Sequence, residues 1–518
     1  MPVAVRINLT APLCLALAVF LLFSGCTPRK AKVPLTPKGT ETPPAAGTEL
    51  ARQLDALFDA PEFQNAFWGV MVQSMDTGEV LYRRNAEKLF MPASNMKLLT
   101  GAAALLRLGK DYRVKTRVLA QGAVRQGVLE GSLIVEGGGD PTLSLRFAPD
   151  DLYAVFVNWA ARLKEAGIRE IKGDIIGDDD LLEEPSLGYG WAWDQAGYSY
   201  SAEAGALQFN ENVVEIRVAA GGRQGQLAGF EMFPAPGLIQ VENNVRTVEA
   251  GAETDISIQR DVEGNRVRMQ GQIALGEAPA RVKVAVHNPT LFFADQLRHI
   301  LAREGIHVSG KAVDADDLNP KPDRGAAVLL WMHESPPLEK ILAVLLKESQ
   351  NLYAETLLRI LGKECSGDGS FRAGRQAVQE ILQGMAIPPG DYVMMDGSGL
   401  SRYNFLKPEM LLRLFRFLVQ VPEFSTYYQS LPVGGVDGTL ASRLKGGPAE
   451  NNVHAKTGTL ANVRSLSGFV RARDGELLGF SMIANHFTVP HRQAEKVQDA
   501  AAELLAGLAR GKKAEAQD

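Results

Sequence analysis

Strand-like hydrophobic patterns occur in four segments that lie close to the two ends of this 518-residue chain, and in the two segments nearer the C-terminal end hydrophobic and polar residues alternate. Such alternation is typical of β-strands with one buried face. The four segments are residues 68–73, 79–82, 463–473 and 476–485. The turns Asp76-Thr77-Gly78 and Arg473-Asp474-Gly475 separate the members of each pair, so a hairpin is predicted near each end of the chain. A helical pattern over residues 492–508 follows the second hairpin.

Helical spacing of apolar residues dominates much of the region between the hairpins. A helix is predicted to begin at Ser94 and to end at Leu108, because Gly109 follows the last apolar position. Three further helical patterns cover residues 291–304, 338–347 and 352–361. Strands at both ends with helices between them predict an α/β (α+β) domain assembled from discontinuous segments.

The interval between the first of these helices and the next is longer than one small helical subdomain needs. It contains strand-like segments and one amphipathic helix, at residues 114–119, 128–136, 171–176 and, for the helix, 150–166. Beyond Asn212 the interval is rich in strand and turn residues. We therefore predict an insert of two β-rich subdomains over residues 113–286, which divides the main domain into residues 49–112 and 287–510.

The first 48 residues differ in composition from the rest of the chain. Arg6 precedes the apolar run 11–23, which is too short to span a bilayer with ease and is typical of a signal peptide, predicted here as residues 1–25. Residues 26–48 are rich in Pro, Thr and Lys and are predicted to form a disordered tether. Residues 511–518 are expected to form a disordered tail. Export of the chain is the expected outcome.

Charge, cysteine and histidine content exclude several classes of partner and cofactor. The formal net charge is −5 and no basic stripe is present, which argues against nucleic acid. Of the three cysteines, Cys14 lies in the predicted signal peptide and Cys26 directly after it, so Cys365 has no disulfide partner within the folded part. The seven histidines show no metal-ligand spacing, so neither a metal nor another cofactor is predicted.

Three short motifs follow one another in a characteristic order along the chain. They are Ser94-Asn95-Met96-Lys97, Ser349-Gln350-Asn351 and Lys456-Thr457-Gly458. The S-x-x-K pattern recurs by chance at residues 442–445, whereas S-x-N and K-T-G each occur once, so the ordered set is the informative feature. It resembles the three-part active-site signature of penicillin-recognising serine enzymes.

The residues of these motifs can carry out acyl transfer. The Ser94 hydroxyl is a poor nucleophile near neutral pH, and Lys97 is placed one helical turn away to accept its proton. A lysine acts as a base only if its pKa falls, and partial burial together with Lys456 as a second cation would lower it. Ser349 would relay the proton to the leaving amine, and Asn351 would hold Lys97 and the substrate amide.

The third motif is expected to bind the substrate from the edge of a strand. Backbone N–H groups of Ser94 and Thr459 would meet the oxyanion. Thr457, Gly458 and Thr459 are predicted to contact the substrate, and the two threonine hydroxyls with Lys456 suit a carboxylate. Singly, these residues could be helix caps or solvated strand residues, but that reading leaves the ordered triple unexplained.

Four further segments extend the resemblance to class C low-molecular-mass penicillin-binding proteins, the D-alanyl-D-alanine carboxypeptidase/endopeptidase family: residues 137–143, 190–194, 396–402 and 435–440. The resemblance covers about residues 50–510 and implies a penicillin-recognising serine transpeptidase-like catalytic domain with an insert after the first motif. It also implies hydrolysis of D-Ala-D-Ala peptide ends and of peptidoglycan cross-bridges through an acyl-Ser94 intermediate. β-Lactams would acylate the same serine.

Two further expectations rest on resemblance alone. The family often has an acidic pair after the second Trp, which meets the amino group of the substrate side chain, and Asp194 followed by Gln195 stands there in this chain. Residues 22–26 resemble a bacterial lipobox, so Cys26 is expected to carry a lipid anchor, with ordinary signal cleavage as the alternative. In a double-membrane bacterium, the protein would then be an outer-membrane lipoprotein on the periplasmic side.

Two competing functions remain open at this point. A β-lactamase or esterase could use the same nucleophile, although no additional glutamate is identifiable for activating water and the large insert suits a polymeric substrate. A catalytically silent wall-binding scaffold is the second alternative, and the intact Ser94, Lys97 and Lys456 argue against it.

Overall fold

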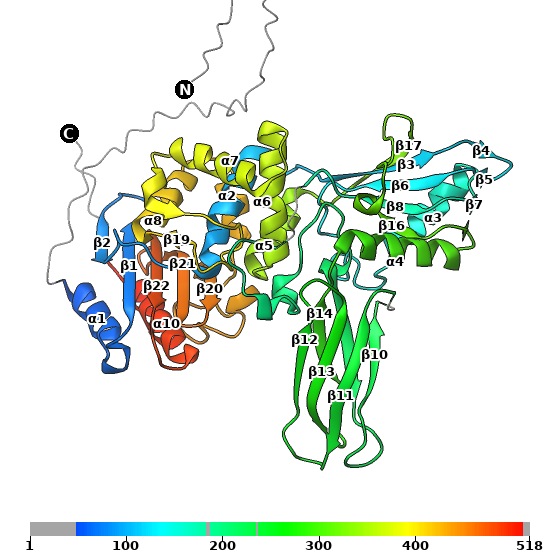
Figure 1. Cartoon of the computed structure of the whole chain (residues 1–518). Helices are drawn as coiled ribbons and strands as arrows, with labels where there is room; N and C mark the ends of the chain where they lie inside the picture. The colour runs from blue at the N-terminus through cyan, green and yellow to red at the C-terminus, as the bar shows by residue number, and fades with distance from the viewer. Residues whose placement is uncertain (1–47, 183–186, 235–236, 511–518) are drawn as a thin grey trace, which may run out of the picture.

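A computed structural model describes residues 48–182, 187–234 and 237–510. The predicted signal peptide, Cys26, most of the predicted tether and the predicted tail lie outside the described residues. Within the described ranges, no helix has the length and apolarity that crossing a bilayer demands. A helix-covered main body and an insert with two parts make up the molecule (Figure 1).

An antiparallel five-stranded sheet joins the two ends of the chain. Its strand order is β2-β1-β22-β21-β20, with the bounds β1 Phe67–Ser74, β2 Val80–Arg84, β20 His454–Leu460, β21 Val463–Arg471 and β22 Leu477–Asn485. Both predicted hairpins are present, and β1 pairs with β22 along its whole length. The main domain is therefore discontinuous, as predicted.

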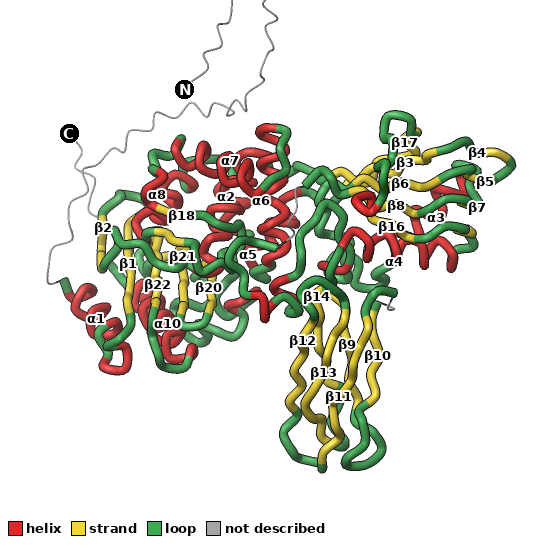
Figure 2. Tube along the Cα trace, in the orientation of Figure 1, coloured by secondary structure: helices red, strands yellow, loops and turns green. Residues whose placement is uncertain are grey.

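Side chains alternate between the two buried faces of this sheet. Trp68, Val70 and Val72 pack in one apolar cluster with α1 (Glu49–Phe58) and α10 (His491–Gly507). Met71 and Met75 lie in a second cluster that the remaining helices of the main domain form. The sheet is thus a central layer between two helical layers, which Figure 2 shows by secondary structure.

The second helical layer surrounds α2 (Met96–Leu108). Residues 96–105 of α2 are all buried, as expected for a helix that is covered on every side. The layer consists of α2, α5 Leu338–Lys347, α6 Asn351–Ser366, α7 Phe371–Gln383, α8 Pro408–Leu418 and α9 Phe424–Gln429, with a small sheet of β18 Tyr392–Val393 and β19 Phe405–Leu406. The helices predicted at 338–347 and 352–361 are present as α5 and within α6.

The first part of the insert consists of two sheets and two helices. A five-stranded sheet has the order β16-β8-β6-β3-β17, with β3 Lys115–Gln121, β6 Ser132–Glu136, β8 Ile175–Asp178, β16 Ala312–Asp314 and β17 Val328–Glu334. A smaller sheet contains β4 Val124–Arg125, β5 Val128–Leu129, β7 Glu170–Ile171 and β15 His307–Val308. The helices are α3 Ala154–Glu165 and α4 Pro289–Arg303. The single strand predicted at 128–136 is wrong, because a bend at residues 130–131 divides it into β5 and β6.

The second part of the insert is a pair of three-stranded sheets that projects from the body (Figure 1). One sheet contains β9 Val213–Ala219, β10 Gly229–Phe233 and β14 Ala280–Ala285, and the other β11 Gln240–Val248, β12 Asp255–Arg260 and β13 Arg266–Ala274. This part is the β-rich subdomain predicted beyond Asn212.

The predicted end of the insert at residue 286 is wrong. Helix α4 packs in the apolar cluster of the insert, β16 pairs with β8, and β17 pairs with β3. The insert therefore extends to Glu334, and the main domain resumes just before α5. The helical pattern at 291–304 identified an amphipathic helix correctly, but such a pattern does not specify which neighbour covers the apolar face.

Candidate active site

The structure brings the three motifs together on the second helical side of the sheet. Ser94 lies in a short 3₁₀ turn, Ala93–Asn95, that leads into α2, so the serine precedes the α-helix that was predicted to begin with it. Ser349 and Asn351 lie where α5 gives way to α6, and Lys456 lies on β20. Five residues predicted from motif order alone thus meet in one site.

Lys97 makes three hydrogen bonds from a fully buried position. Its Nζ atom lies 3.0 Å from Ser94 Oγ, 2.6 Å from Asn351 Oδ1 and 2.7 Å from the Ser398 carbonyl oxygen. A neutral lysine has two N–H donors and one lone pair. Because Asn351 and Ser398 offer only acceptor oxygens here, they occupy the two N–H groups and leave the lone pair for the Ser94 hydroxyl.

Burial lowers the pKa of Lys97 to about 7, against the opposing attraction of Asp396 and Glu355. Burial also holds the pKa of Lys456 well below its usual value, and repulsion from Lys97 adds to that effect. Lys456 was expected to be a main cause of the lowered pKa of Lys97. Burial is instead the dominant cause of that lowering. Near neutral pH, Lys97 can therefore accept the proton of Ser94.

Ser349 and Lys456 form a second hydrogen-bonded pair beside the first. Lys456 Nζ donates to Ser349 Oγ at 2.8 Å and to its neighbour's carbonyl, Thr457 O, at 2.8 Å. Ser349 adopts a positive φ of 60°, an uncommon backbone conformation for serine that often marks functional sites. The side chain of Ser349 is thereby held at the second lysine, as the proposed proton relay requires.

Strand β20 presents the third motif at the edge of the sheet. The N–H of Ala455 donates to Pro432 O, away from β21, and alternation points the N–H groups of Thr457 and Thr459 the same way. Gly458 lies against the first motif, since an added Cβ would lie 2.8 Å from Pro92 O and 3.0 Å from Ser94 N. A glycine is needed here for this close approach.

Asn95, inside the first motif, was not predicted as a site residue. Its buried side chain donates to Lys456 O at 2.8 Å and accepts a hydrogen bond from Ser467 Oγ at 2.6 Å. It thereby ties the start of α2 to strands β20 and β21. The sequence feature that could have identified Asn95 is its position between Ser94 and Lys97 in the first motif.

Sequence reasoning also missed Glu355 and Asp396, which hold the turn that carries Ser398. The buried Glu355 carboxylate accepts hydrogen bonds from Ser398 N at 2.8 Å and Gly397 N at 3.2 Å. Asp396 accepts from Gly399 N and Ser401 N, at 2.7 and 2.6 Å. Burial, with repulsion from Asp396, raises the pKa of Glu355 to about 7.

Glu355→Gln is expected to shift the acidic limb of the pH dependence of the acylation rate to lower pH. The charged groups that act on Lys97 are Lys456, Asp396 and Glu355. Glu355 is an anion near and above pH 7, and its substitution removes the part of that charge that favours protonated Lys97 there. The pKa of Lys97 then falls below about 7, and the base is free at lower pH. Acylation rates measured across pH with a chromogenic β-lactam test this. Glu409→Gln, at another buried carboxylate, is the control, and an unshifted limb in Glu355→Gln would contradict the prediction.

Asp194 lies apart from the catalytic groups. It is exposed on the 3₁₀ turn Trp193–Gln195, within a loop that Trp191 and Tyr200 fasten to the main domain. Trp191 Nε1 donates to Asp396 Oδ2 at 2.9 Å, and Asn351 Nδ2 donates to Tyr200 O at 2.7 Å. The loop that carries Asp194 therefore contacts the site through Trp191 and Tyr200.

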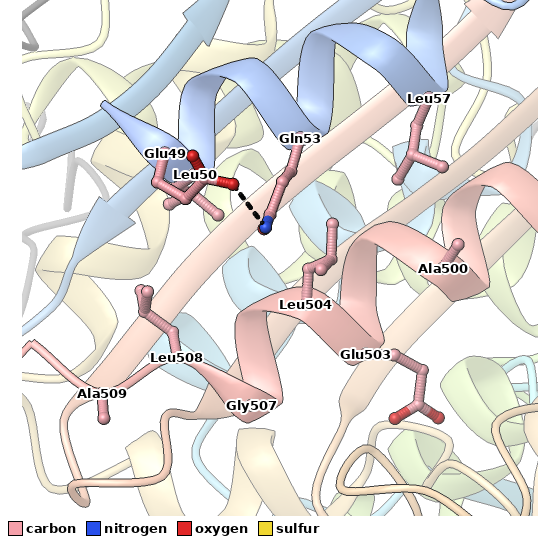
Figure 3. Close-up of a pocket in the computed structure, with 10 residues that line it drawn as sticks. All are labelled: Glu49, Leu50, Gln53, Leu57, Ala500, Glu503, Leu504, Gly507, Leu508 and Ala509. Carbon is pink, nitrogen blue, oxygen red and sulfur yellow. Dashed lines mark hydrogen bonds between the residues drawn. The ribbon is translucent and has the colours of Figure 1, made fainter. Parts of the chain in front are cut away.

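A groove elsewhere on the main domain contains none of these residues. It lies between α1 and α10, and Leu50, Leu57, Leu504 and Leu508 line it, with Glu49, Gln53 and Glu503 at its polar edges (Figure 3). These helices cover the other face of the sheet. The groove is therefore separate from the three motifs.

Comparison with known proteins extends over nearly the whole described chain. The profile of the D-Ala-D-Ala carboxypeptidase 3 (S13) family matches residues 50–508. A D-alanyl-D-alanine carboxypeptidase from an Actinomadura species is 35% identical over 474 residues, which are 89% of this chain and 85% of that protein.

Solved structures agree with this sequence match. The crystal structure of penicillin binding protein 4 from Haemophilus influenzae superposes with a TM-score of 0.75 at 27% identity, over 86% of this chain and 97% of that one. Its complex with a β-lactam gives a TM-score of 0.70 at 27% identity, over 88% and 98%. The predicted fold class, an α/β penicillin-recognising catalytic domain with inserted β-rich subdomains, is confirmed.

Proposed function

The chain belongs to the D-Ala-D-Ala carboxypeptidase 3 (S13) family and is a serine-type D-alanyl-D-alanine carboxypeptidase, and on that basis we propose that Ser94 is its nucleophile and Lys97 its general base. The predicted resemblance to class C low-molecular-mass penicillin-binding proteins is confirmed by the same findings. The observation that carries the proposal is the hydrogen bond between Lys97 Nζ and Ser94 Oγ, made by a lysine whose pKa burial lowers to about 7.

Acylation follows from the positions of these groups. The Ser94 Oγ attacks the carbonyl carbon of the penultimate D-alanine while Lys97 Nζ takes its proton. Negative charge on the carbonyl oxygen meets the N–H groups of Ser94 and Thr459. The amide C–N bond then breaks, and the terminal D-alanine leaves as an amine after it receives a proton through Ser349 and Lys456. Water hydrolyses the acyl-Ser94 ester and restores the serine.

Substrate binding at the third motif couples to the charge of Lys456. Thr457 is held by a 2.7 Å hydrogen bond between its hydroxyl and that of Thr439, and Thr459 is exposed on the open edge of β20. We assign the terminal carboxylate of the peptide to Thr457, Gly458, Thr459 and Lys456. An arriving carboxylate favours the protonated form of Lys456, and this ammonium group then gives its proton through Ser349 to the leaving amine.

Endopeptidase activity on peptidoglycan cross-bridges is the second part of the proposal. The loop of the insert that carries the exposed Asp194 contacts Asn351 through Tyr200, so a substrate chain longer than the D-Ala-D-Ala end has protein to contact. Asp194 is proposed to attract the amino group of the substrate side chain. β-Lactams are proposed to acylate Ser94, which the complex of the Haemophilus influenzae relative with a β-lactam supports.

The place of action is inferred from the first residues of the sequence. We propose that residues 1–25 direct export and that Cys26 receives a lipid that holds the enzyme on the periplasmic side of the envelope, at the outer membrane. Metabolic labelling of the full chain with a fatty acid, beside Cys26→Ala, tests this. Equal labelling of both chains would refute lipidation at Cys26.

Penicillin is expected to form a long-lived adduct on Ser94. Purified protein that lacks residues 1–26 is incubated with penicillin, and intact mass and peptide mapping locate the acyl group. One adduct on the peptide that contains Ser94, with slow release of the drug, is the expected result. Rapid turnover would favour a β-lactamase, an adduct on another residue would refute Ser94 as nucleophile, and no adduct at all would favour a silent scaffold.

A further inference from the structure

Three consecutive residues adopt a left-handed backbone conformation where the chain enters the projecting subdomain. Asn210, Glu211 and Asn212 have φ values of 50°, 56° and 55°, directly before β9. Residues other than glycine visit this region singly rather than in runs. Such a conformation persists only where its surroundings hold it, and it is concentrated at functional sites. The contacts of this turn therefore indicate what it does.

The Glu211 carboxylate faces the second motif. Its Oε2 atom accepts a hydrogen bond from Gln350 Nε2 at 2.7 Å, and its Oε1 atom accepts one from the Tyr353 hydroxyl at 3.2 Å. Gln350 is the middle residue of Ser349-Gln350-Asn351, and Tyr353 lies in the first turn of α6. One side chain of the insert therefore holds the start of α6.

Arg146 fixes the position of Glu211 from within the insert. Arg146 Nε donates to Glu211 Oε1 at 2.7 Å and Arg146 Nη2 donates to Glu211 Oε2 at 3.3 Å, so the carboxylate is bound at both oxygens. Only 11% of the Glu211 side chain is exposed. A charge-assisted contact at two points gives direction as well as strength. Glu211 is therefore a fixed support for Gln350.

The insert holds both residues that follow Ser349. Asn351 Nδ2 donates to Tyr200 O at 2.7 Å, beside the contact of Gln350 with Glu211. Ser349 itself has a positive φ, and a conformation of that kind depends on such supports. The first and third motifs are instead joined to each other within the main domain. The second motif is thus the one whose placement the insert controls.

We propose that Glu211 is a positioning residue for the proton relay: through Gln350 it holds Ser349 at Lys456, so that departure of the leaving amine depends on a residue of the insert. The inference rests on the proposed function, since it takes Ser349 as the relay. Glu211 acts through Gln350 and not on the reacting atoms. Its loss should leave the attack by Ser94 intact and impair the transfer of a proton to the leaving group.

Two leaving groups separate these steps. In a D-Ala-D-Ala peptide, Ser94 Oγ attacks the carbonyl carbon, the C–N bond breaks, and the amine nitrogen must receive a proton as it leaves. The second substrate is the same peptide with D-thiolactate, joined through a thioester, in place of the terminal D-alanine. There the C–S bond breaks and the sulfur leaves as a thiolate, which needs no proton. The terminal carboxylate and methyl group are the same in both, so only the amide requires the relay.

The test measures kcat/KM for both substrates, which reports acylation in each case. In Glu211→Ala, kcat/KM for the amide is expected to fall about tenfold, a part of the roughly 10²- to 10⁴-fold contribution of general acid–base catalysis, and kcat/KM for the thioester to stay close to the wild-type value. Gln350→Ala should show the same selective loss, and the double variant no further loss, because both changes break one contact. Gln350→Ala also serves if Glu211→Ala does not fold.

Glu215→Ala is the matched control, because Glu215 is a glutamate on β9 that pairs with Arg217. Equal losses on both substrates in Glu211→Ala would show a general disturbance of the site, and no loss on either would show that Gln350 needs no such support; both results overturn the inference. Ser349→Ala tests the premise separately, since it should lose activity on the amide selectively. If Ser349→Ala lost both activities alike, the relay in the proposed function would itself fail, and the inference with it.

Discussion

Lys97→Met is expected to slow acylation by both penicillin and a D-Ala-D-Ala peptide at least about 10⁴-fold, the loss typical of removing one member of a catalytic unit. Lys97 is the one group within hydrogen-bonding distance of Ser94 Oγ among the described contacts that can take its proton. Methionine fills nearly the same volume without a lone pair on nitrogen. Stopped-flow acylation rates over pH 5 to 10, together with intact mass, give the measurement.

Lys97→Met is also expected to have a larger free energy of unfolding than the wild type. Burial lowers the pKa of Lys97 from its usual 10.5 to about 7, so the folded state disfavours the charge that the unfolded chain carries. Below pH 7 the buried charge of Lys97 lowers the free energy of unfolding of the wild type by its full amount. This destabilisation is relieved as the pH rises from 7 towards 10.5. The difference in unfolding free energy between Lys97→Met and wild type should therefore shrink over that window.

Lys407→Met is the control for both measurements, because Lys407 is half-buried and pairs with Asp391 away from the three motifs. It should acylate at nearly the wild-type rate. If Lys97→Met retained more than about a hundredth of the wild-type rate, a smaller loss than general-base catalysis normally supplies, another base must serve Ser94.

Lys456→Met is expected to reduce D-alanine release from a peptide by about 10³-fold, within the usual range for general acid-base catalysis. The change removes the donor to Ser349 Oγ and the positive charge that meets the substrate carboxylate. Loss of the relay lowers kcat, and loss of the charge raises KM, so both parameters should change. The rate of D-alanine release as a function of peptide concentration separates them.

A substrate without a free carboxylate provides the control for Lys456→Met. For an ester or amide at the peptide end, the contribution of charge pairing is already absent, so the variant should lose only its kcat contribution. An unchanged KM for the peptide with its free carboxylate would mean that Lys456 does not bind that group.

The groups proposed to react could be identified from the sequence because their chemistry resides in their side chains. Ser94, Lys97, Ser349, Asn351 and Lys456 were proposed from motif order. In the structure Lys97 is hydrogen-bonded to Ser94 and Asn351, and Lys456 is hydrogen-bonded to Ser349. The identification was possible because few other structures need these residue types at these spacings.

The supporting groups could not be predicted in the same way. Ser398 acts through its carbonyl oxygen, which every residue possesses, and Glu355 acts by accepting two backbone N–H groups. Neither leaves a distinctive pattern. The end of the insert was missed for a related reason, because the apolar face of α4 fits a main-domain helix as well as it fits the insert sheet.

The pairing of β1 with β22 has a consequence for how the enzyme reaches its working form. Strand β1 is the second strand of the sheet and β22 is its central one, yet nearly the whole chain separates them. A lone β1–β2 hairpin is only marginally stable in water. The main domain therefore cannot complete its core until β22, at Leu477–Asn485, has been synthesised, so the active site is assembled only when synthesis of the chain is nearly finished.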